Sequence, residues 1–138
     1  MTGQVATAIL CLGARRMTEA QDHFTHGVEA FKVGDCDTAI EELEAATRLD
    51  HGNHKAFNYL GAAYAAKDRF NAAIGAFKAA EQTAPGVAST HYNIAQAYEA
   101  TGILNEAEYE YERAIEIDPS YTRATEALDR LKKRLHHV

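Results

Sequence analysis

The sequence has no tryptophan, only two prolines and only two cysteines. Cys11 and Cys36 do not form a Cys-x-x-Cys pair, so neither a disulfide framework nor a zinc ribbon is expected. No apolar run approaches the ~18 residues of a membrane span. The short apolar run 5–12 is not preceded by lysine or arginine, which disfavours a signal peptide. We therefore expect a cytoplasmic protein with no membrane span.

Basic residues are also scarce relative to acidic ones, and the formal net charge is -6 over 138 residues. Nucleic-acid binding requires clustered lysine and arginine to displace counterions, so we expect no nucleic-acid partner. Hydrophobic residues make up 46% and charged residues 25%, which is typical of a globular chain of one domain. Many of the residues are good helix formers and few are breakers, which favours an all-α fold.

Related residues recur every 34 positions along the chain. The recurring sets are Gly27, Gly61 and Ala95; Ala30, Tyr64 and Tyr98; Ala39, Ala73 and Ala107; Leu43, Phe77 and Tyr111; and Ala46, Ala80 and Ala114. Composition alone does not produce five such sets, so the spacing indicates three copies of one structural unit. Small residues suit close helix contacts, and the large apolar residues fill the space around them.

The second copy carries the fullest motif: Phe57, Leu60-Gly61, Tyr64, Phe70, Ala73, Phe77, Ala80 and Pro85. On this motif the chain resembles the tetratricopeptide-repeat family. The first copy departs from the pattern, with His23, His26 and His51 where the family prefers an aromatic residue, leucine and proline. The resemblance implies an all-α, right-handed superhelical solenoid of antiparallel helix pairs that binds proteins.

In this register the chain divides into repeats 20–53, 54–87 and 88–121, with a terminal helix at each end, 1–19 and 122–138. The expected helices are 20–33, 36–49, 54–67, 70–83, 88–101, 104–117 and 122–135. Gly34 and Gly102 suit the left-handed backbone at helix ends, whereas Asp68 takes the same place less comfortably. The last helix is amphipathic and basic, which suits a cap on the solenoid.

The N-terminal segment is open to two interpretations. Val5, Ile9 and Leu12 precede Ala39, Leu43 and Ala46 by 34 residues, which is the register of a second helix. The segment is then half of a degenerate repeat that packs on the first copy. The alternative is a disordered or partner-dependent start. We expect its apolar residues to be buried against the first copy or against a second molecule, the latter being self-association through this helix.

Few residues have the spacing of a chemical site. His23 and His26 share a helix face, but no carboxylate or cysteine completes a ligand set, so no metal and no cofactor are expected. Nothing pairs a nucleophile with a base in a recognisable motif, so we expect no enzyme activity. The acidic residues of the third copy, such as Glu106 and Glu110, are interpreted as a solvated convex face, with a contact to the basic cap of another molecule as the alternative.

The family register also implies a binding groove on the concave side, apolar at one end and polar-aromatic beyond. The residues expected there are Phe24, Val28, Phe31, Lys32, Lys55, Asn58, Tyr59, Tyr92, Asn93, Gln96 and Arg123. In members that bind chaperone tails, lysine, asparagine and arginine clamp a terminal carboxylate; the matching places here hold Phe24, Val28, Tyr59, Ser89 and Asn93. Binding to Hsp70 or Hsp90 tails is therefore disfavoured. We expect a scaffold or adaptor for a protein or peptide partner. The alternative is a dedicated chaperone or assembly factor, similar to the three-repeat chaperones of bacterial secretion systems.

Overall fold

The computed structural model describes residues 2–136, which form seven α-helices and no strand. The helices are α1 (Thr2–Lys32), α2 (Cys36–Leu49), α3 (His54–Ala66), α4 (Phe70–Thr83), α5 (Ala88–Ala100), α6 (Leu104–Ile117) and α7 (Thr122–His136). From α2 onward each helix begins where the sequence predicts it and ends within one residue of the predicted position. No helix in the described range is long and apolar enough to cross a membrane.

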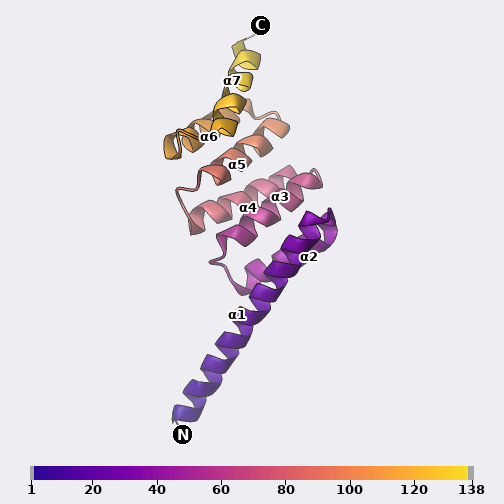
Figure 1. Ribbon diagram of the computed structural model, residues 1–138, viewed down its shortest axis with the longest axis vertical. Coiled ribbons are helices and arrows are strands. Elements are labelled where there is room, and N and C mark those ends of the chain that lie inside the picture. Colours follow the sequence, from indigo (N-terminus) through magenta and orange to yellow (C-terminus); the bar gives the residue numbers. More distant parts are fainter. Residues whose placement is uncertain (1, 137–138) are drawn as a thin grey trace.

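The helices form a stack of pairs that runs the length of the molecule, with the two ends of the chain far apart (Figure 1). Three pairs pack together: α1 with α2, α3 with α4, and α5 with α6. Neighbouring pairs meet through α2 with α3 and α4 with α5, and α7 closes the end against α6. The stack is therefore an all-α solenoid, as the sequence predicts.

The 34-residue repeat corresponds to one packing site that occurs in each pair. Leu43, Phe77 and Tyr111 occupy it and are all buried. Glycines lie opposite the first two: a Cβ atom on Gly27 would lie 2.6 Å from Leu43 Cγ, and one on Gly61 would lie 2.5 Å from Phe77 Cε1. Because such distances are shorter than van der Waals contact, a small residue at this position allows the two helices of a pair to approach.

The turns within the pairs use a left-handed residue, as predicted. Gly34 has φ 85° and Gly102 has φ 81°, while Asp68 takes the same role with φ 58°. Asparagine and aspartate tolerate this region better than other side-chain-bearing residues do. Two helices are also capped at their first turn, because Asp35 accepts a hydrogen bond from Thr38 N and Asn53 accepts one from Ala56 N. The chain thus changes direction at positions set by local chemistry.

The interpretation of residues 1–19 as a separate helix folded back on the first copy is wrong. α1 is continuous from Thr2 to Lys32, and its N-terminal half projects from the stack (Figure 1). Val5, Ile9 and Leu12 are 60%, 63% and 63% exposed, so they are not buried against the first copy. No proline or glycine lies between Ala14 and Ala20 to end the helix. The 34-residue match at this end therefore reflects apolar composition rather than a shared fold.

Histidine replaces the usual aromatic residue in the first and third pairs, and each histidine meets a glutamate. His23 Nδ1 lies 2.6 Å from Glu42 Oε2, and His91 Nδ1 lies 2.7 Å from Glu110 Oε2. Each glutamate comes 19 residues after its histidine. His91 is buried and Glu110 largely so, and a carboxylate that accepts this hydrogen bond offsets the cost of removing the imidazole from water. His23 is therefore part of a packing pair.

The basic cap also contacts acidic groups of its own chain. Arg134 Nη1 donates to Glu99 Oε2 at 3.1 Å, and Lys132 Nζ lies 4.0 Å from Glu112 Oε1. These exposed links join α7 to α5 and α6, beside the buried contacts of Ala127, Leu128 and Leu131. Part of the acidic surface of the third repeat is thus occupied within the molecule.

Candidate binding groove

The predicted groove would lie on the surface formed by the first helix of each pair. α1 contacts α3, and α3 contacts α5, in addition to the contacts that each makes within its pair. Because these helices lie close to one another on one side of the stack, they line its inner surface. The side chains that face this surface come from helix positions three and four residues apart.

The centre of the inner surface contains a pocket with an apolar floor of small side chains. Its volume is about 410 Å³. The residues that line it are Ala62, Ala65, Ala66, Phe70, Phe77, Asn93, Gln96 and Ala97. Alanine methyl groups leave a hollow that larger side chains would fill, and Asn93 and Gln96 stand beside it as hydrogen-bonding groups. This arrangement suits one apolar side chain of a ligand, held next to a polar backbone.

A second, smaller hollow of about 230 Å³ adjoins the first through Gln96. It is also lined by Glu99, Ala100, Tyr111 and Arg130. Glu99 accepts hydrogen bonds from Tyr111 Oη at 3.0 Å and from Arg134 Nη1 at 3.1 Å. Burial raises the pKa of Tyr111, and the hydrogen bond to the Glu99 carboxylate raises it further, so the phenol stays protonated and donates. Each carboxylate oxygen of Glu99 therefore already has one partner within the molecule.

At the N-terminal end of the groove, the expected aromatic residues pack on one another. Phe24 and Phe31 both make edge contacts with Tyr59, with ring centroids 6.2 and 5.7 Å apart. All three rings are partly buried against the core of the first two pairs. Val28 is also half-buried, whereas Lys32 is exposed. This end therefore offers the edges of a filled aromatic cluster to a ligand.

Farther along, several of the expected polar residues make contacts within the molecule. Asn58 accepts from Thr90 Oγ1 at 3.3 Å, which links α3 to α5. Tyr92 packs against Tyr111 and Tyr121, and its hydroxyl accepts a hydrogen bond from Gln96 Nε2 at 2.8 Å. Of the basic residues expected here, Lys55 and Arg123 are both exposed.

Sequence reasoning did not identify the pocket floor. Alanine at positions 62, 65, 66 and 97 looks like helix packing, because the chain is rich in alanine throughout. The sequence feature that could have indicated the pocket was the run Ala62-Ala63-Tyr64-Ala65-Ala66, because alanines on two faces of one helix turn exceed what a single helix contact needs. Among the described residues, no group of three His, Cys, Asp or Glu side chains has an arrangement that could hold a metal ion.

Family models of the tetratricopeptide repeat match residues 24–88 and 88–121. The chain belongs to the tetratricopeptide-repeat family. It is 33% identical to mouse (Mus musculus) tetratricopeptide repeat protein 14 over an alignment of 114 residues, and the match covers 78% of this chain. The match covers 15% of the mouse protein, so the chain spans a small part of that relative's length.

Two solved structures share the fold and contain a bound peptide. One is the first tetratricopeptide-repeat domain of Spaghetti (RPAP3) bound to the HSP90 peptide SRMEEVD, with a TM-score of 0.82, 24% identity, and coverage of 86% of this chain and 94% of that one. The other is the Yersinia enterocolitica type III secretion chaperone SycD with a peptide of the translocator YopD. Its TM-score is 0.79 at 20% identity, with coverage of 84% and 94%.

Proposed function

We propose that this tetratricopeptide-repeat chain is a protein-binding scaffold that holds an extended segment of a partner along its inner surface. The alanine pocket, which α3, α4 and α5 line together, carries the proposal, because it is an apolar hollow beside the hydrogen-bonding groups of α5. An apolar anchor of the partner enters this pocket, while Asn93 and Gln96 hydrogen-bond to the backbone of the segment beside it. Two structural neighbours are peptide complexes, which supports a peptide segment as the ligand of this chain.

Binding, with no chemical step, is the whole of the proposed activity. The family fold is typically one of protein interaction, and the proposed groove residues hold and orient a ligand. We also propose a cytoplasmic location, for which the two free cysteines, Cys11 and Cys36, give support.

Filling the alanine pocket is expected to weaken binding. The substitution Ala66→Phe places an aromatic ring in the pocket. Because Ala66 is exposed at the end of α3, the substitution should leave the fold intact. Peptides selected from a random library on the wild-type chain would be titrated by calorimetry. We expect the affinity to fall at least about tenfold, equivalent to ~1.4 kcal/mol.

The control is Gln82→Phe, which adds the same ring to an exposed position on α4, outside the pocket. Its affinity for the selected peptides should match that of the wild type. If Ala66→Phe and Gln82→Phe bind these peptides equally well, the pocket is not the anchor site and the proposal fails.

The acidic peptide SRMEEVD is expected not to bind this chain measurably. A terminal carboxylate needs cationic or amide donors at several points, and four of the five corresponding positions hold Phe24, Val28, Tyr59 and Ser89. Phe24 and Tyr59 are moreover packed together. Fluorescence anisotropy with labelled SRMEEVD measures this affinity, with a library-selected peptide as the positive control. Micromolar affinity for SRMEEVD would show that other groove cations, such as Lys55 or Arg123, replace the clamp.

A further inference from the structure

The N-terminal extension, residues 2–19 of α1, continues beyond the helix that packs against it. α2 runs back along α1 and ends at Leu49, and Ala20 is the first buried residue of α1. Every residue from Val5 to Glu19 is exposed. The N-terminal extension therefore exposes the face that α2 would cover if α2 continued beyond Leu49.

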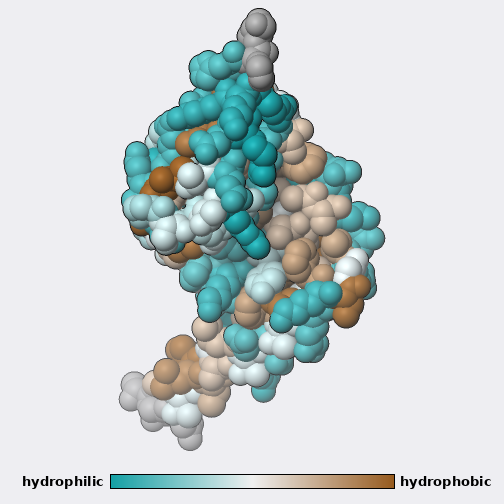
Figure 2. Space-filling model, turned by 45° about the horizontal axis from the view of Figure 1, so that its top comes forward, coloured by the Kyte–Doolittle hydropathy of each residue, from teal (hydrophilic) through white to brown (hydrophobic). Residues whose placement is uncertain are grey.

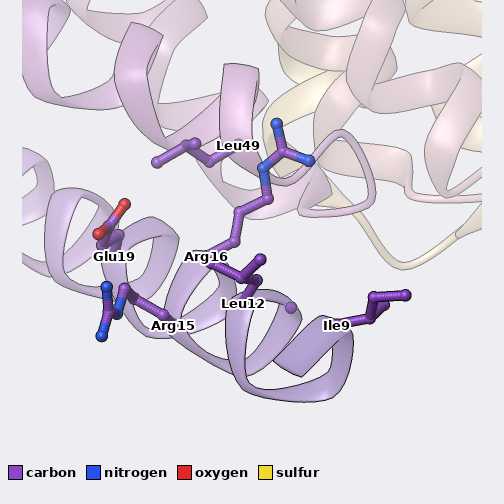
Figure 3. Close-up of a pocket in the computed structure, with 7 residues that line it drawn as sticks. Ile9, Leu12, Arg15, Arg16, Glu19 and Leu49 are labelled. Atoms are coloured by element: carbon purple, nitrogen blue, oxygen red, sulfur yellow. The ribbon is translucent and has the colours of Figure 1, made fainter. Parts of the chain in front are cut away.

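That face is apolar and hollowed where α2 ends. A depression of about 530 Å³ is lined by Ile9, Leu12, Gly13, Arg15, Arg16 and Glu19 of α1 and by Leu49 of α2. Figure 3 shows Ile9 and Leu12 along the helix and the Arg16 side chain extending toward the helix that carries Leu49. Hydrophobic surface is also visible near the free end of the molecule, at the lower left of Figure 2. A helix with such a face gains stability when a partner covers it.

We propose that the N-terminal extension pairs with the N-terminal extension of a second copy of this chain, antiparallel and around a two-fold axis. The partner helix then lies in line with α2, over the part of α1 that α2 does not reach. This inference concerns a surface separate from the inner groove. This mode of dimerisation leaves the inner groove of each copy free.

The spacing of the stripe fits an identical antiparallel helix. Val5, Ile9, Leu12 and Arg16 follow one another at steps of four, three and four, which read the same in both directions. With the axis between residues 10 and 11, Ile9 of each copy meets Leu12 of the other. Arg16 lies over Val5, where its methylene stem adds apolar contact while the guanidinium reaches water. The steps are those of a coiled-coil seam.

The charges also favour this occupant. No charged residue lies between positions 2 and 14, so two copies bring no like charges together at the centre of the seam. The charged residues Arg15, Arg16 and Glu19 of each copy lie at the outer ends of the paired segment, where their side chains reach water.

The association is tested with the full chain by sedimentation equilibrium. We expect a dimer for the wild type at micromolar concentrations. Ile9→Glu places two carboxylates in the seam and should raise the dimer dissociation constant at least about tenfold. Ala14→Glu adds the same charge to the opposite face of the helix and should leave the dimer intact. Because both positions are exposed, the melting temperature of the repeats should be unchanged in dilute solution.

The direction of pairing is tested with cysteine substitutions in a chain in which Cys11 and Cys36 are replaced by serine. A mixture of Ile9→Cys and Leu12→Cys chains should form the mixed disulfide faster than either chain cross-links to itself. Faster self-cross-linking would show a parallel pair and overturn the proposed geometry. A wild-type chain that is monomeric, or that binds lipid vesicles in place of itself, would overturn the inference and leave the groove proposal untouched.

Discussion

An alanine in place of Phe77 is expected to reduce the free energy of unfolding by about 3–5 kcal/mol. Phe77 is buried at the centre of the second pair, where its ring lies directly over the glycine of the opposite helix. Removing the ring deletes its apolar contacts and leaves a cavity between rigid helices. Urea unfolding followed by circular dichroism measures the change. Tyr109→Ala removes an aromatic ring that is 55% exposed and should cost far less.

A second substitution tests whether the Gly61–Phe77 contact is the cause. Gly61→Ala should destabilise the wild type, since the new Cβ would lie 2.5 Å from the ring. In the Phe77→Ala chain the same change should be harmless or stabilising, because alanine favours helix and the space is empty. Additive effects of the two substitutions would contradict this packing account.

Removing the carboxylate that contacts Nδ1 of the buried histidine should produce the second large effect, although Nε2 keeps Glu81 at 3.7 Å. Glu110→Ala leaves His91 Nδ1 without the carboxylate that lies 2.7 Å away, and His91 is only 3% exposed. An unsatisfied buried polar group costs about 1–3 kcal/mol, so we expect a loss of that size in the free energy of unfolding.

Glu112→Ala is the matched control. Glu112 lies two residues after Glu110 on the same helix, its side chain is exposed, and it makes only a 4.0 Å contact with Lys132. It should change stability by less than about 1 kcal/mol. If the two glutamate variants unfold at the same urea concentration, the histidine pair does not contribute to stability. Glu110 was interpreted from the sequence as part of a solvated face, but its side chain is largely buried against His91.

Sequence predicted the repeated part of the fold because its signals are local or strictly periodic. Gly61 and Phe77 recur with their counterparts at 34-residue steps, and each turn has Gly34, Asp68 or Gly102 at the left-handed position. Such residues fix helix ends and close contacts regardless of the rest of the chain. The helix boundaries followed directly from them.

The features that sequence missed depend on distances between elements. Whether Ala66 fills a contact or borders a hollow is decided by the separation of α3 and α5, which no single residue encodes. The pairing of His91 with Glu110 requires two helices to be aligned first. At the N-terminus the periodic match of Ile9 with Leu43 was misleading, because nothing near Arg16 ends the helix and the segment simply continues α1.

The central claim, that the inner groove holds the partner, is tested most directly by mapping a library-selected peptide on the labelled chain by NMR. We predict that the largest amide shift changes fall on α3 and α5, around Ala62, Ala66 and Gln96, with little change on the exposed residues of α4 and α6. Shift changes concentrated on α4 and α6, with those three amides unmoved, would contradict the account.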